Sequence, residues 1–157
     1  MHLDGSYTFD APRGRVWQAL QSPAVIAQCM PGCETFEEIG ADRYEATMRI
    51  GIGPIKGTYT GRIHLRDRVA PEQYVMEVEG GGGPGHMKGS GLLTLEERGG
   101  QTVVSYDGDA QVTGKVASVG QRLLGVTAKQ LITQFFKCME RKLDSGAAEA
   151  GTEAGRA

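Results

Sequence analysis

The spacing of apolar residues changes its period along this chain, and the change limits the folds that it can adopt. From residue 33 to residue 113 apolar and polar side chains alternate, which predicts β-strands. From about residue 116 to residue 143 apolar residues recur at steps of three and four, which predicts one helix of roughly 42 Å at 1.5 Å per residue. An apolar sheet face has to be covered, and this helix is the element that can cover it.

Shorter elements precede the alternating segment. Residues 6–9 predict a strand, Pro12 lies near the first turn of a helix, and Ser22 and Pro23 form an N-cap and first turn for a second helix ending near Met30. The remaining strands are predicted at 33–39, 42–52, 57–69, 72–80, 86–98 and 101–113. The chain should therefore adopt an α+β fold, in which a seven-stranded antiparallel sheet wraps around a long C-terminal helix, with two short helices after the first strand.

The length of 157 residues fits one domain, which we expect to span residues 1–144. Residues 145–157 are small, polar and glycine-bearing, so we expect a disordered tail there.

Glycine is abundant, with 24 residues, and it clusters at 51–57, 80–91 and 113–120. In an antiparallel meander these three segments fall at the same end of the sheet, which we call the mouth. Each segment carries a lysine: Lys56, Lys88 and Lys115. The first segment also holds an apolar loop tip, so the predicted rim of the mouth comprises Ile52, Pro54, Ile55 and the three lysines.

Several of the strand glycines, among them Gly57, Gly61, Gly89 and Gly91, should face the final helix and leave volume beneath it. Large neighbours such as Trp17, Phe135 and the methionines could fill that volume. Alternatively, it forms a pocket for an apolar or amphipathic ligand. The residues expected to line such a pocket are Met48, Ile50, Tyr59, Ile63, Met76, Met87, Leu93, Tyr106, Leu123 and Thr127.

Composition excludes several classes of protein. The net charge of −2 provides no positive electrostatic potential that would attract nucleic acid. No apolar run approaches the roughly 18–20 residues that span a membrane. The start of the chain has no secretion signal, so we expect a cytoplasmic location and reduced cysteines that serve only in packing. Cys29 and Cys33 have no histidine nearby to complete a metal site, and no catalytic motif occurs. We therefore expect no catalytic residue, no metal and no enzymatic activity.

The rim suggests contact with the inner face of the plasma membrane. Each lysine near an anionic leaflet contributes about 1 kcal/mol to the free energy of membrane binding. The alternative is that these lysines are scattered surface charges.

Four motifs resemble the family of carbon monoxide dehydrogenase G subunits. They are Cys-Met-Pro-Gly-Cys-Glu at 29–34, Gly-Ile-Gly-Pro-Ile-Lys-Gly at 51–57 with Tyr59 and Gly61, Gly-Lys-Val-Ala-Ser-Val-Gly at 114–120, and the pair Phe135 and Phe136. The resemblance covers about residues 1–143 and implies the helix-grip fold of the START and pollen-allergen (SRPBCC) superfamily.

The resemblance also implies an accessory protein of a molybdenum-containing hydroxylase rather than the enzyme itself. Such a protein would hold a quinone or lipid in its cavity, need no other cofactor, and link the hydroxylase to the cytoplasmic membrane. Some members attach through a long C-terminal extension, but the residues after Leu143 contain no apolar anchor. The alternative is a protein-docking or maturation module with a filled core and no ligand.

Overall fold

One antiparallel sheet organises the protein. The computed structural model describes residues 1–51, 56–83 and 85–149, with side chains through residue 144. Among these residues, seven strands pair in the order β1-β7-β6-β5-β4-β3-β2. The strands are β1 His2–Phe9, β2 Cys33–Gly40, β3 Arg43–Ile50, β4 Gly57–Val69, β5 Gln73–Gly82, β6 Gly85–Arg98 and β7 Gln101–Thr113. The predicted strand order along the chain is confirmed.

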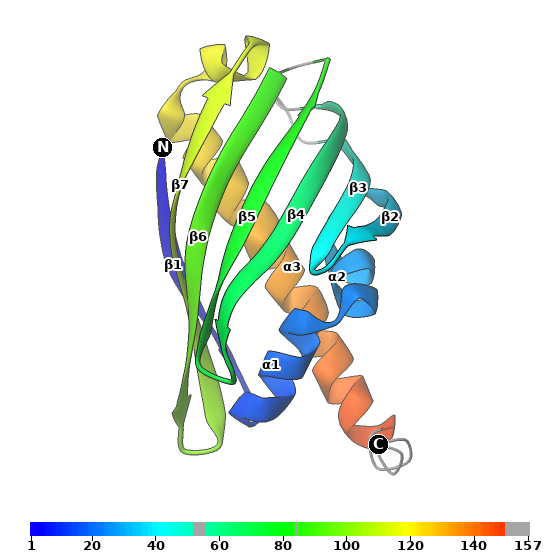
Figure 1. Cartoon of the computed structure of the whole chain (residues 1–157). Helices are drawn as coiled ribbons and strands as arrows, with labels where there is room; N and C mark the ends of the chain where they lie inside the picture. Colours follow the sequence, from blue (N-terminus) through cyan, green and yellow to red (C-terminus); the bar gives the residue numbers. More distant parts are fainter. Residues whose placement is uncertain (52–55, 84, 150–157) are drawn as a thin grey trace.

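Helices cover one face of this sheet. α1 (Arg13–Gln21) and α2 (Pro23–Cys29) follow β1, and a short 3-10 helix, η2 (Lys115–Val119), leads into the long α3 (Gln121–Glu149). The Ser22 hydroxyl accepts a hydrogen bond from the Val25 amide at 3.3 Å, which caps α2 as the sequence predicts. Figure 1 shows the curved sheet wrapping around α3, so the predicted α+β helix-grip architecture is confirmed.

Some boundaries differ from the sequence prediction. β1 begins at His2 rather than residue 6, because it pairs with β7 over its whole length, from His2 opposite Asp109 to Phe9 opposite Thr102. Gly120 adopts a φ of 100° and separates η2 from α3, so residues 116–143 are not one continuous helix. α3 continues through Glu149, so the expected domain boundary at residue 144 falls inside a helix. Residues 150–157 of the expected tail lie outside the described residues.

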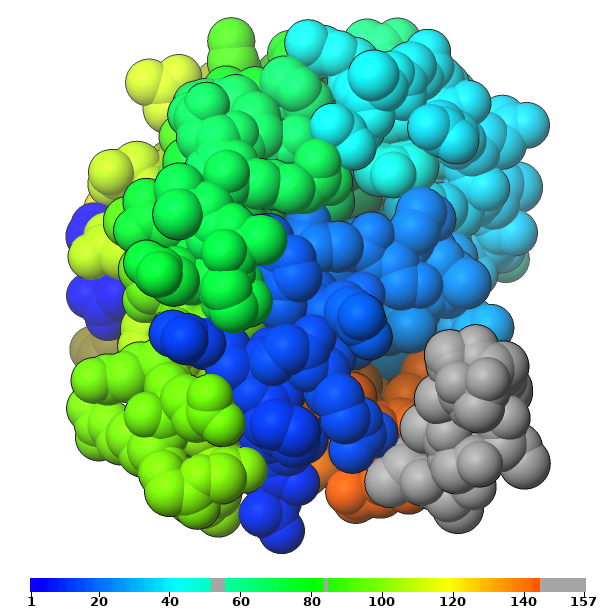
Figure 2. All heavy atoms as spheres, turned by 60° about the horizontal axis from the view of Figure 1, so that its bottom comes forward, coloured from blue at the N-terminus to red at the C-terminus, as the bar shows by residue number. Residues whose placement is uncertain are grey.

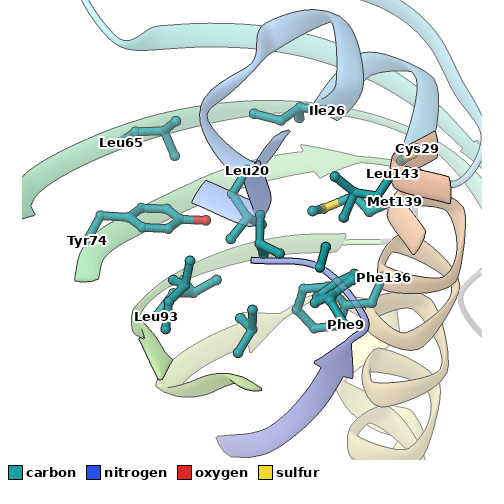
Figure 3. Packing of buried hydrophobic residues seen from close by; sticks show 14 of the residues in the cluster. Phe9, Leu20, Ile26, Cys29, Leu65, Tyr74, Leu93, Phe136, Met139 and Leu143 are labelled. Carbon is teal, nitrogen blue, oxygen red and sulfur yellow. The ribbon is translucent and has the colours of Figure 1, made fainter. Parts of the chain in front are cut away.

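The hydrophobic core lies at the end of the sheet opposite the mouth. Its fully buried members include Phe9 from β1, Leu20 from α1, Tyr74 from β5 and Met139 from α3 (Figure 3). Figure 2 views this end and shows α1 and α2, in blue, filling the space between the turns of the sheet and α3. The C-terminal half of α3 is therefore packed into the core.

Specific bonds reinforce the position of α3. The Tyr7 hydroxyl on β1 donates to the Glu140 carboxylate at 2.6 Å, and the Arg15 guanidinium on α1 donates to the Leu143 carbonyl at 2.7 Å. Burial, followed by the hydrogen bond to Glu140, raises the pKa of Tyr7 to about 12. The hydroxyl therefore remains protonated, and able to donate, throughout the physiological range.

A disulfide joins α2 to α3, and it corrects the expectation that the cysteines serve only in packing. Cys29 and Cys138 are bonded across 109 residues of sequence, whereas Cys33 is free and partly exposed. The sequence alone does not predict this pairing, because the two cysteines are far apart along the chain and no local pattern indicates which residues of the two helices will be in contact.

We predict that reducing this disulfide lowers the free energy of unfolding by about 2–5 kcal/mol, because the crosslink restricts a long loop in the unfolded chain. Urea unfolding of the oxidised protein with and without a phosphine reductant measures the difference. C33S is the matched control and should keep the full effect, while C29S should abolish it. Equal unfolding midpoints for the oxidised and reduced protein would contradict the prediction.

Candidate functional site

The glycine-rich segments meet at one end of the sheet, as strand parity predicts. The end of β3, the connection from β5 to β6 and the short helix η2 all lie at the top of Figure 1, above the first turns of α3. The glycine run is not simply a turn, however. Gly80, Gly81 and Gly82 belong to β5 and pair with both β4 and β6, which is possible because the backbone of glycine can extend like any other.

A cavity opens between the sheet and the N-terminal half of α3. Its outer compartment, next to the mouth, has a volume of about 250 Å³. The walls are mostly apolar side chains and glycines from the strands, η2 and α3, with His86 and Thr127 as polar members. The lining residues include Met48, Ile50, Tyr59, Gly61, Met87, Val116 and Thr127.

An inner compartment of about 370 Å³ continues from the outer one toward the core. The two compartments share six wall residues: Leu3, Val78, Met87, Ala110, Ala128 and Leu131. The inner walls include residues of α1, α2 and α3 as well as of the sheet, for example Leu20, Ile26, Ile63, Tyr74, Met76, Leu93, Tyr106 and Phe135. The two adjoining compartments are mainly apolar and together have a size that suits a lipid-like small molecule.

Small residues on the inner face of the sheet create this space. Gly61 lies opposite Gly80 across β4 and β5, and Gly91 lies opposite Gly108 across β6 and β7. A Cβ atom at Gly80 would come within 2.9 Å of the Gly61 Cα. At Gly61 itself the nearest atom would be 3.7 Å away, which is an ordinary contact. The cavity is therefore deeper at these positions, because backbone atoms rather than side chains form part of its wall on the sheet.

The helix η2 closes part of the mouth. Val116 is buried and lines the outer compartment, while Gly114 and Gly120 on either side of η2 adopt φ values of 87° and 100°. A Cβ atom at Gly85 would lie 3.3 Å from the Val116 Cβ, and the φ of 155° at Gly85 also disfavours a side chain. Glycines thus allow η2 to turn inward and to lie against the start of β6.

The structure brings together nine of the ten residues expected to line a pocket. The outer walls contain Met48, Ile50, Tyr59 and Thr127, the inner walls contain Ile63, Met76, Leu93 and Tyr106, and Met87 borders both compartments. Leu123 is the exception, because its side chain is 46% exposed on the outer face of α3 and lines neither compartment. The helical period is correct, but the buried residue at this turn is Leu124 rather than Leu123.

The expected rim is only partly assembled. Lys56 and Lys115 are exposed at the mouth, next to the start of β4 and at the start of η2. Lys88 is exposed on the outer face of β6, opposite Glu79, since its neighbour Met87 faces the cavity. The predicted three-lysine rim is thus reduced to two lysines. Ile52, Pro54 and Ile55 lie outside the described residues.

Sequence reasoning missed several residues of the cavity wall. Tyr74 and Val78 share the inward face of β5 with Met76, so strand alternation could have identified them. Leu3 lies in the part of β1 that the predicted strand does not include. Ile26 comes from α2, whose packing against the inner compartment has no signal in the local sequence.

Polar groups are scarce in the cavity wall. Asp107 and Asp109 border the inner compartment, but their side chains are 68% and 82% exposed and lie beside His2 on the outer face. His2, Asp4 and Asp107 come close enough to hold a cation, but all three are exposed, and such groups are common without an ion, so we assign them no function. Among the described residues, no lysine or arginine lines either compartment.

The chain is similar to known proteins over most of its length. The profile of the carbon monoxide dehydrogenase G-subunit family (CoxG) matches residues 5–144. No curated protein matches the sequence.

Among solved structures, a conserved protein from Geobacillus kaustophilus is 36% identical, with a TM-score of 0.90, over 92% of this chain and 96% of that one. A START superfamily protein from Mycobacterium smegmatis is 10% identical, with a TM-score of 0.74, over 92% and 97% of the two chains. The second likeness concerns the fold alone.

We predict that Gly61→Leu blocks the cavity without unfolding the protein, because Gly61 is the floor position with room for a side chain. Binding of the neutral apolar dye N-phenyl-1-naphthylamine should weaken by about tenfold or more, because the leucine side chain would occupy space that the dye fills and inserted bulk costs about 1–3 kcal/mol. Thr60→Leu, one residue away on the exposed face of β4, is the matched control. Equal dye binding by G61L and T60L would contradict the assignment of the cavity.

Proposed function

Because the chain belongs to the CoxG family of carbon monoxide dehydrogenase G subunits, we propose that it is a non-catalytic accessory protein of a molybdenum-containing hydroxylase of that type. In this proposal the protein holds an apolar ligand, such as a quinone or lipid, and connects the hydroxylase with the cytoplasmic membrane. It acts in the cytoplasm and associates peripherally with the inner face of the plasma membrane.

One observation carries the proposal, namely the two-compartment apolar cavity between the sheet and α3. A cavity of this kind is unfavourable in an empty protein, because its walls lose the contacts that close packing would provide. An apolar occupant restores those contacts. The methionines at positions 48, 76 and 87 give the walls adaptable shapes, which suits a long flexible ligand.

The same observation disfavours the alternative of a docking module with a filled core. Phe135 does take up part of the space as a wall residue of the inner compartment, whereas Trp17 packs edge-on against Tyr74, with 5.5 Å between ring centres, and lines neither compartment. They leave the remaining volume open. A docking role for the outer surface is compatible with a ligand inside.

We predict that native mass spectrometry of the purified protein detects a non-covalent adduct of lipid size, and that a menaquinone with a short isoprenoid tail binds in its place. G61L should lose both the adduct and the binding, because its new side chain enters the outer compartment. A wild-type protein that is empty in every preparation and does not bind the menaquinone or a neutral lipid would refute a ligand-carrying function.

The membrane part of the proposal is supported by the outer face of α3 near the mouth. Leu123 and Val126 are 46% and 60% exposed there, one turn apart, beside the exposed cations Arg122 and Lys129. Residues 114–139 contain four cations and no carboxylate, although the whole chain has a net charge of −2. An apolar pair flanked by cations matches an anionic lipid surface. The helices of the described residues include none with the length and hydropathy of a membrane span.

We predict that the protein floats with liposomes containing anionic phosphatidylglycerol, and that the double variant L123S/V126S binds them several-fold less. Loss of one exposed apolar residue elsewhere, in Leu92→Ser on the outer face of β6, should change nothing. The double variant Arg122→Gln/Lys129→Gln should bind the liposomes more weakly, and its binding should depend less on salt concentration. K88Q should change neither the binding nor its salt dependence. If L92S reduces flotation as much as L123S/V126S does, the contact is nonspecific and this surface is not the docking face.

A further inference from the structure

Tyr74 lines the inner compartment of the cavity, and its buried hydroxyl has no hydrogen-bond partner. Tyr74 is fully buried on β5 and forms part of the wall of the inner compartment. Among the described residues, its hydroxyl is one of three buried side-chain polar groups without a partner. Figure 3 shows this oxygen pointing toward Leu20 and into the group of apolar side chains around it. A buried hydroxyl left without a partner is unfavourable, so its presence at the end of a ligand cavity calls for an explanation.

The tyrosine ring is held in this position. Trp17 packs against it edge-on, with 5.5 Å between ring centres and 90° between ring planes. Leu20 and Leu93, which line the same compartment, are also buried. The hydroxyl therefore cannot turn outward to reach water without disturbing the core.

The hydroxyl acts as a donor rather than as an anion. Burial raises the pKa of Tyr74 well above its ordinary value, and the opposing effect of Arg68 is smaller. The guanidinium of Arg68 is engaged elsewhere, because it contacts the Asp42 carboxylate at 2.9 Å and donates to the Gln21 side-chain oxygen at 2.6 Å. Thus Arg68 is not free to neutralise an anion inside the cavity.

Resting on the proposed function, we propose that Tyr74 is the polar anchor of the ligand. The ligand enters with its head group first, and the head is an uncharged group with a carbonyl oxygen that accepts the hydrogen bond of Tyr74. The apolar chain of the ligand then extends through the outer compartment toward the mouth.

The charge of the wall selects against anionic head groups. No lysine or arginine lines the compartments among the described residues, and Met1, which carries the N-terminal ammonium, and His86 line only the outer one. A carboxylate or phosphate at the inner end would therefore be buried without a cation beside it. A head without oxygen would leave the hydroxyl unpartnered. Met30 and Met76 line the inner compartment, and their unbranched side chains can change rotamer to let a head group reach the hydroxyl.

The test compares matched ligands on wild type and Y74F by titration calorimetry. One pair is a 1,4-naphthoquinone with a short isoprenoid tail and the same prenylated naphthalene without its oxygens. The other pair is a fatty acid methyl ester and the corresponding free fatty acid, which distinguishes an acyl-ester source of the carbonyl from a quinone. If the natural ligand is a quinone, the wild type should bind the naphthoquinone about tenfold more tightly than the naphthalene. If it is an acyl ester, the wild type should bind the methyl ester about tenfold more tightly than the free fatty acid. A factor of this size is expected for one buried hydrogen bond.

In Y74F the preference for the naphthoquinone over the naphthalene should disappear and the ester should bind more weakly than to wild type, while affinity for the oxygen-free naphthalene stays unchanged. The infrared carbonyl band of the bound ligand should lie at lower frequency in wild type than in Y74F, which a merely structural role of the tyrosine would not produce. Tyr44→Phe, a buried tyrosine outside both compartments, is the matched control. Without ligand, Y74F should melt at the wild-type temperature or above it, because the substitution removes an unpartnered polar group.

The outcomes separate the two claims. If Y74F keeps the carbonyl preference and the infrared band of wild type, the anchor is refuted while the ligand-carrying function stands. The anchor is also refuted if the free fatty acid binds more tightly than its ester. If wild type binds none of the four ligands, the proposed function itself fails, and the anchor fails with it.

Discussion

The attachment of α3 over its C-terminal half is the constraint on which the rest of the structure depends. Phe136, Met139 and Leu143 pack into the core, and the disulfide from Cys29 to Cys138 ties the same half to α2. Because this end is fixed, the N-terminal half of α3 can extend above the sheet without having to fill the space beneath it. The C-terminal half of α3 thus anchors the fold, and the inner compartment ends against this core, where Leu20, Tyr74 and Phe136 line it.

The floor of the sheet complements this arrangement. Facing glycines on neighbouring strands, such as Gly61 and Gly80, lower the surface below the part of α3 that is not packed into the core. Glycine in a strand has no side chain to pack, and it loses more conformational entropy on folding than other residues do. A sheet with many inward glycines is therefore less stable than one with larger residues. A bound apolar molecule would return part of that stability through mass action, which links ligand occupancy to folding.

The order of strands, the covering helix and most of the cavity wall can be predicted from the sequence, because they follow from the periods of the apolar pattern. Prediction fails where long-range contacts decide. The pairing of Cys29 with Cys138 depends on how two helices meet, and the expectation of a reducing compartment points away from a disulfide. Leu123 is misplaced because the apolar period alone does not decide which of two adjacent leucines faces the sheet, and Leu124 is the buried one. Lys88 belongs to the rim by its position along the chain, although alternation on β6 turns it outward.

The methionines provide the most direct test of the central claim that the space beneath α3 is the ligand site. Met48, Met76 and Met87 line the cavity, whereas Met139 is fully buried in the packed core. In protein labelled with ¹³C at the methionine methyl groups, titration with a short-tailed menaquinone should shift the signals of Met48, Met76 and Met87 and leave that of Met139 in place. Saturable binding that moves none of the methyl signals of Met30, Met48, Met76 and Met87, all of which line the cavity, would contradict the account.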